Sequence, residues 1–216
     1  IFIIFLILLI LLSSDNETVK IFNESFVVDK FSLYLKVLIL VSAFFVLLMS
    51  KRYIIDIKNN KFEYPIIILL SLFGMFIMVS SNDLILFYLG LELQSLALYI
   101  LASIDRDNIK SSEAGIKYFV LSALSSGLLL YGCSLIYGFT GSTSFEEIAN
   151  NSQDFSVGII FGMVFILVGL GFKVSAVPFH MWTPDVYQGS PTSVTSFFSI
   201  VPKITAIAIF IKFMYL

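Results

Sequence analysis

The stretch GLGFKVSAVPFHMW, residues 169–182, places a charge and a helix breaker inside an apolar segment. The apolar run that leads into it begins at Ser156, and Lys173 and Pro178 follow within it. A charge near the centre of a bilayer costs at least about 2.5–3.5 kcal/mol, and a proline interrupts the hydrogen-bond ladder of a helix. Both features need an explanation from the rest of the chain.

The composition places the chain in a membrane. Of its 216 residues, 58% are hydrophobic and only 13% are charged, whereas a soluble domain carries about 25% charged residues. The net charge of −2 and the lack of a basic patch do not point to nucleic acid. One cysteine, Cys133, and one histidine, His180, leave no disulfide or cysteine-ligated cluster within this sequence, and no glycine-rich nucleotide fingerprint occurs. No metal or cofactor site is therefore expected in it.

Apolar runs of spanning length follow one another along the sequence. They cover roughly residues 31–49, 64–81, 83–103, 114–138, 156–178 and 193–216. Each is near the ~20 residues that a helical span needs. The opening run IFIIFLILLILL is too short to cross a bilayer and lacks the features of a signal peptide, so it is expected to be the end of a longer helix. The sequence predicts an all-α integral membrane protein with about seven transmembrane helices, because a helix satisfies its backbone groups within one span.

Basic residues gather in alternate connections between these spans. One set of connections carries Lys51, Arg52, Lys58, Lys61, Arg106 and Lys110. The intervening connections carry only Lys20 and Lys30, and GSTSFEEIANNSQD carries none. The positive-inside rule therefore places the first set inside, which is the matrix in a mitochondrion. The string SSND at residues 80–83 predicts a tight turn between two spans.

A few ionisable residues lie within the predicted spans. These are Lys36, Lys117, Lys173, Lys203, Lys212 and Glu92. Lys36 and Lys212 lie near span ends, where long side chains can carry their charges to the interface. Lys117 lies four residues after Glu113, and its side chain could either reach the interface in the same way or have a functional role.

Polar residues form a stripe on two of the spans. Tyr88, Glu92, Ser95 and Tyr99 are spaced by four, three and four residues, so they share one helix face, which should point toward protein or water. The alternative is a carboxyl group that only links helices. Ser196, Ser199 and Lys203 repeat the pattern on the last span. There the alternative is a lysine in a structural ion pair.

The region around Lys173 has two interpretations. Four of the five prolines fall between residues 178 and 202, which favours a helix that breaks at SAVP and resumes to about residue 188. Lys173 would then lie near the midplane, beside freed carbonyls at the negative end of a helix dipole. Such breaks are tolerated where they are buried in protein or line a cavity, and transporters use them. The alternative is an ordinary kinked helix followed by an amphipathic surface segment.

A carboxylate and two lysines near the middle of the membrane indicate that the chain can bind and release protons. Burial and a nearby opposite charge act in opposing directions on the pKa values of glutamate and lysine. A pair that is drawn together and then separated can therefore bind and release a proton. A static arrangement would not suffice, because something must switch the pair.

Three stretches resemble a known family, the antiporter-like membrane subunits of respiratory complex I (NADH:quinone oxidoreductase). They are SNDLILFYLGLELQSLALYILA, SSEAGIKYFVLSALSSGLLLYG and GLGFKVSAVPFHMWTPDVYQGSPTSVTSFF. The string PFHMWTPDVYQGSPT is long and specific, and within the family it is most similar to the N-type subunit, subunit 2. The resemblance implies the first half of an inverted-repeat fold, with residues 64–216 as the first five-helix repeat and residues 1–63 outside it.

The resemblance also implies a proton path and its setting. It assigns Glu92 and the broken-helix Lys173 to a pair, Lys203 to the central position on the next helix, and Lys117 to a less certain role. His180, after the break, is implied to help link two half-channels. NADH, FMN, iron–sulfur clusters and ubiquinone are implied in other subunits, whose quinone reduction would drive proton pumping here.

Several expectations follow for the surroundings of the chain. The second repeat of the family is absent from the sequence, so a fragment or one piece of a split subunit is expected, with a second chain supplying the rest. The expected partners are other membrane-arm subunits of complex I and membrane lipid. The alternatives are a cation/proton antiporter subunit, the plastid NDH homologue, or a purely structural module. The Ile-, Phe-, Lys- and Asn-rich composition favours the mitochondrial inner membrane, with a bacterial plasma membrane as the alternative.

Overall fold

The computed structural model describes residues 4, 7, 10, 18–56, 62–151 and 156–215. Within them, six helices are long and apolar enough to span a membrane. They are α2 (Lys30–Asp56), α3 (Glu63–Ser80), α4 (Leu84–Ala102), α5 (Ile109–Thr140), α7 (Val157–Val174) and α9 (Thr192–Tyr215). These helices confirm the six predicted spans. The helix expected over residues 1–12 falls, apart from three helical residues, outside the described part of the chain.

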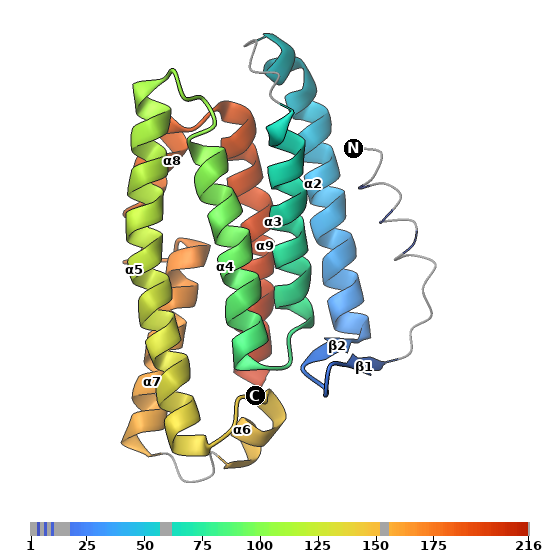
Figure 1. Cartoon of the computed structure of the whole chain (residues 1–216), viewed down its shortest axis with the longest axis vertical. Coiled ribbons are helices and arrows are strands. Elements are labelled where there is room, and N and C mark those ends of the chain that lie inside the picture. The colour runs from blue at the N-terminus through green and yellow to red at the C-terminus, as the bar shows by residue number, and fades with distance from the viewer. Residues whose placement is uncertain are drawn as a thin grey trace.

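The helices form a bundle in which the connections alternate between two ends (Figure 1). The loop that carries Arg106 lies at the same end as the start of α3, because its guanidinium pairs with Glu63 at 3.4 Å. Lys51 and Arg52 fall in the last part of α2, while Lys58 and Lys61 lie outside the described residues. Among the described residues, the connections rich in basic residues and those with few or none thus lie at opposite ends of the bundle. Which end faces the inner side of the membrane stays a prediction.

A short β-hairpin accompanies the helices of the all-α fold. Strands β1 (Val19–Ile21) and β2 (Phe26–Val28) pair antiparallel, with Val19 opposite Val28. The Asn82 N–H donates to the Ser25 carbonyl at 2.8 Å, so the hairpin is tied to the turn between α3 and α4. Three-residue strands are too short for their alternation to be distinguished from loop sequence.

A short helix, α6 (Phe145–Asn151), lies in the polar connection between α5 and α7, where no helix was predicted. Its anchor is Phe145, which is only 1% exposed. The ring of Phe145 meets that of Phe213 edge-on, with the centroids 5.2 Å apart. One buried aromatic side chain therefore holds this connection against the end of α9.

The contact between α3 and α4 determines the rotation of α4. Residues 80–83 form the predicted tight turn, and the Asp83 carboxylate caps α4 by accepting the Ile85 N–H at 2.7 Å. A Cβ atom on Gly74 would lie 2.5 Å from the Gln94 nitrogen, and one on Gly90 would lie 2.7 Å from the Met78 nitrogen. The two backbones approach as closely as small residues permit, which is a common packing mode of membrane helices. With this face of α4 occupied, a different face is left for α5 and α7.

Candidate functional site

The helix predicted to break does so. After α7 ends at Val174, Ser175 adopts a left-handed conformation (φ 67°), and residues 176–182 form turns that include the cis peptide bond before the exposed Pro178. The short helix α8 (Thr183–Gly189) then resumes. The Phe172 carbonyl, which accepts the Ser175 N–H at the end of α7, also accepts the Trp182 indole N–H at 3.0 Å. The segment is therefore interrupted rather than continuously kinked.

Lys173, in the last turn of α7, reaches two neighbouring helices. Its Nζ donates to Ser95 Oγ on α4 at 2.8 Å and to Ser122 Oγ on α5 at 2.6 Å. Ser122 Oγ also accepts the Tyr99 hydroxyl at 2.6 Å. Both serines are buried, at 1% and 0% exposure. Three helices of the bundle thus meet at one ammonium group, which has two neutral hydroxyls as its hydrogen-bond acceptors.

Ser122 is a site residue that the sequence analysis missed. A serine within an apolar span is commonly a local hydrogen-bonding residue, so its type alone carries little information. A signal was available in the spacing of Tyr118, Ser122 and Ser126, which repeats every four residues on α5. All three side chains are buried, so a polar face of α5 lies inside the bundle.

Glu92 does not form the expected direct pair with Lys173. Among the described residues, no carboxylate lies within ion-pair distance of the Lys173 ammonium, although Glu92 and Ser95 share the same face of α4. Instead, Ser95 accepts the bond from Lys173, and Glu92 Oε1 is buried without a hydrogen-bond partner. Spacing along α4 predicted the shared face correctly, but it could not show which side chain meets Lys173 across the helices. A buried unpartnered carboxyl oxygen is costly, which singles Glu92 out.

Tyr88, the other end of the stripe on α4, lies apart from Lys173. It lines an open cavity of about 490 Å³ between α4 and α5, together with Cys133 and Tyr137. Glu92 comes one turn later on the same face of α4. The stripe therefore leads from this cavity through Glu92 to the serine that holds Lys173.

Lys203 approaches the second half of the broken helix. Its Nζ lies 5.5 Å from the centroid of the Tyr187 ring on α8, within the range of a cation–π contact. Within the described part of the chain it makes no ion pair, so the structural ion-pair alternative is not realised there. Ser196 and Ser199 donate to carbonyls of α9 itself at 2.9 and 3.0 Å, and they do not join Lys173.

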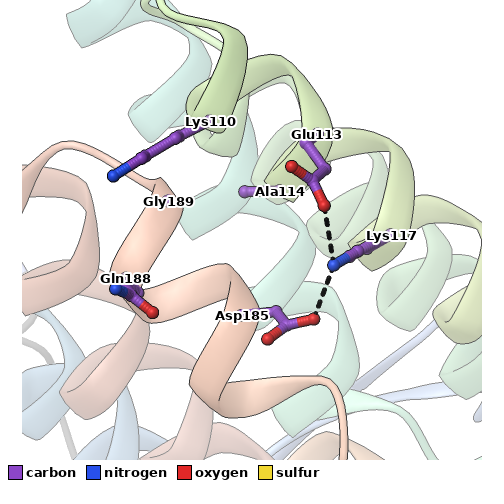
Figure 2. A pocket seen from close by; sticks show the side chains of 7 residues that line it. All are labelled: Lys110, Glu113, Ala114, Lys117, Asp185, Gln188 and Gly189. Atoms are coloured by element: carbon purple, nitrogen blue, oxygen red, sulfur yellow. Dashed lines mark hydrogen bonds and ion pairs between the residues drawn. The ribbon is translucent and has the colours of Figure 1, made fainter.

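Lys117 and His180 differ in their surroundings. The Lys117 ammonium lies 2.8 Å from Glu113 Oε1 on its own helix and 2.7 Å from Asp185 Oδ2 on α8 (Figure 2). Lys117 thus connects α5 to the second half of the broken helix. The His180 side chain lies in the loop between the two halves, and the structure does not bring it to the Lys173 cluster.

The two lysines expected to reach the interface are engaged at the hairpin end of the bundle. Lys36 is only 6% exposed, and its Nζ lies 5.2 Å from the centroid of the Phe26 ring. Lys212 donates to the Ser81 carbonyl and lies 5.7 Å from the centroid of the Phe145 ring. Both ammonium groups thus lie at this end of the bundle, where the hairpin covers that of Lys36.

Fold and site together define an integral, multi-pass membrane protein in which a broken helix presents a partly buried lysine to two neighbouring helices. A profile of the NADH:quinone oxidoreductase/Mrp antiporter transmembrane family matches residues 81–216, and the chain belongs to this family. The resemblance noted in its sequence is confirmed.

Individual relatives agree with this assignment. NADH-quinone oxidoreductase subunit N of Pelagibacter ubique is 59% identical over 93% of this chain and 43% of its own length. A chain of Thermus thermophilus respiratory complex I superposes with a TM-score of 0.84 at 33% identity, covering 97% of this chain and 45% of that one. A chain of the Mrp complex from Dietzia sp. has a TM-score of 0.74 at 26% identity, over 84% of this chain and 34% of that one. The chain therefore spans less than half the length of these relatives.

Proposed function

We propose that the chain forms part of the proton-translocating membrane arm of NADH:quinone oxidoreductase, complex I. The observation that carries this proposal is the setting of Lys173. Its ammonium is bonded to two neutral hydroxyls beside a helix break, while the Glu92 carboxyl oxygen lies buried and unpartnered on the adjoining face. Ionisable groups that are this poorly neutralised inside a membrane are expensive, and they mark proton relays and ion pathways.

The arrangement supports an order of events along the path. A proton would pass along the Tyr88 cavity, Glu92 and, across the Ser95 hydroxyl, Lys173; the cavity lies at the end of the bundle that the charge pattern places outside. Lys203 would follow, because its ammonium lies over Tyr187 on the half-helix after the break. The break itself provides the movable element, since the chain between α7 and α8 lacks the helical hydrogen-bond ladder that would hold it rigid.

The relatives support complex I over the cation/proton antiporter. The subunit N relative is 59% identical, compared with 26% for the Mrp chain. We accordingly place NADH, FMN, iron–sulfur clusters and ubiquinone in other subunits, with other membrane-arm subunits as partners. The bacterial source of the relatives favours a bacterial plasma membrane over the mitochondrial one. A complete translocation path would draw on protein beyond these residues, given the share of the relatives that the chain spans.

Replacing Lys173 by methionine in the assembled complex tests the proposal. The substitution keeps the length and apolar stem of the side chain but removes the proton-carrying group, so proton uptake per NADH oxidised should be lost in inverted membrane vesicles. Lys36→Met is the matched control, because Lys36 is another lysine within a span, but its buried side chain lies under the hairpin, away from the helix break. An assembled Lys173→Met complex that pumps at the wild-type ratio would sink the proposal. Pumping that depends on sodium rather than on NADH oxidation would favour the antiporter.

A further inference from the structure

The half-helix α8 is attached to the bundle mainly through one face of α5. Its inner side is buried, with Trp182, the residue before it, at 3% exposure and Val186 at 0%. The Trp182 ring stacks on Tyr118 of α5, with centroids 4.6 Å apart and planes within 7°. Because the same indole donates to the Phe172 carbonyl, the position of α8 is transmitted to the residue next to Lys173.

The end of α8 meets the start of α5 at backbone distance. A Cβ atom on Gly189 would lie 2.6 Å from the Lys110 carbonyl oxygen and 2.7 Å from the Ala114 Cβ. One turn further along α5, Asp185 pairs with Lys117. Figure 2 shows the carboxylates of Glu113 and Asp185 pointing at the Lys117 ammonium from their two helices. Apolar stacking, close backbone contact and one ion pair thus hold α8 to a short section of α5.

The ion pair differs from the other two attachments because it can be exchanged. Lys117 lies between a carboxylate of its own helix, at 2.8 Å, and one of α8, at 2.7 Å. If Asp185 moves away, Glu113 remains bound to the ammonium. The ammonium is then not left without a partner, so the ionic part of the attachment between α8 and α5 can open at the modest cost of an exposed ion pair. This ion pair therefore suits a contact between α5 and α8 that forms and breaks reversibly.

We propose that Asp185 is a positioning residue that acts through Lys117 to hold α8 against α5. It thereby sets the Trp182–Phe172 contact beside Lys173 and keeps Tyr187 near Lys203. The inference rests on the proposed function, because its effect is expressed as coupling between electron transfer and proton pumping. It assigns Lys117 an electrostatic role rather than that of a proton carrier.

Charge exchange across this ion pair tests this proposal in the assembled complex. Asp185→Asn should lower the protons pumped per NADH oxidised by roughly two- to fivefold, the range that follows from an exposed ion pair. Exchanging the charges with Lys117→Asp and Asp185→Lys should restore the ratio. The exchange is made in a Glu113→Gln background, so that the carboxylate introduced at position 117 has no neighbouring like charge, and Glu113→Gln alone is its reference. Asp107→Asn, which removes an exposed carboxylate from the loop at the same end, should leave the ratio unchanged.

The outcomes separate the possible roles of these residues. A recovered pumping ratio in the charge-exchanged variant supports the proposal that the Lys117–Asp185 ion pair holds α8 to α5. The same holds if Asp185→Asn fails to assemble while the exchanged variant assembles and pumps. An exchanged variant that does no better than Asp185→Asn overturns it, because Lys117 would then be needed for a charge at its own position. A wild-type ratio in Asp185→Asn overturns it as well. Since Lys173→Met is measured alongside, a normal ratio there would reject the proposed function separately.

Discussion

Replacing Ser122 by alanine is expected to detach Lys173 from α5. The Ser122 hydroxyl accepts both the Lys173 ammonium and the Tyr99 hydroxyl, each at 2.6 Å. It is fully buried, so alanine removes the oxygen and leaves both donors facing an apolar methyl group. Ser95 remains as the second acceptor for Lys173. The substitution therefore weakens the polar cluster without emptying it.

The size of the effect follows from the bonds that are lost. A hydrogen bond to a charged group contributes about 1.5–3 kcal/mol, and each ~1.36 kcal/mol on a barrier changes a rate tenfold. If the whole loss falls on the step that moves a proton at Lys173, that step slows by roughly tenfold to a hundredfold. Because the bond to Ser95 persists, we expect the lower end of this range.

The assay is the initial rate of proton uptake into inverted vesicles, divided by the rate of NADH oxidation. Ser126→Ala is the matched control, because Ser126 lies one turn away on the same helix, is also buried, and donates to the carbonyls of Ser122 and Ala123 on its own helix. Ser122→Thr, which retains a hydroxyl, should recover most of the ratio. If Ser122→Ala and Ser126→Ala behave alike, the hydroxyl of Ser122 does not serve Lys173 and the reasoning is refuted.

Two further substitutions test the packing that positions the site. Gly90→Ala would place a Cβ atom 2.7 Å from the Met78 nitrogen, and overpacking of this kind costs about 1–3 kcal/mol, so the assembled complex should lose activity at a lower temperature. A melting temperature equal to that of Gly127→Ala, whose Cβ would meet nothing within 4 Å, would contradict this. Trp182→Phe keeps an aromatic ring against Tyr118 but removes the donor to the Phe172 carbonyl; a bond of about 1 kcal/mol predicts up to a roughly fivefold fall in the pumping ratio. An unchanged ratio in that variant would show that α8 does not act on Lys173 through its indole.

The sequence was a good guide to the spans and to the break for a simple physical reason. A membrane span must satisfy its backbone internally over ~20 apolar residues, so each run is visible without knowledge of its neighbours. The break at SAVP was visible for the converse reason, since proline removes a ladder donor and the following residues stay apolar. The hairpin at Val19–Val28 escaped notice because it depends on contacts with the turn at Asn82, far along the chain.

The site was predicted to the level of helix faces but not of contacts. Periodicity placed Glu92 and Ser95 on one face of α4 correctly, yet it could not show that Ser95 rather than Glu92 receives the Lys173 bond. The depth and rotation of α7 against α4 decide that choice, and they depend on packing between helices. Ser122 was missed for the same reason, because its partner is 51 residues away in sequence.

One short section of α5 contacts both halves of the broken helix. Lys117 pairs with Asp185, Tyr118 stacks on Trp182, and Ser122 holds Lys173. These three residues span less than two turns of a helix. A displacement of α5 along its axis would therefore alter the Lys173 bond and the α8 attachment together, whereas a movement of α4 would act on the cluster through Ser95 and through the bond from Tyr99 to Ser122. If proton transfer at Lys173 is switched from elsewhere in the complex, α5 is consequently the helix on which that signal can act on both halves at once.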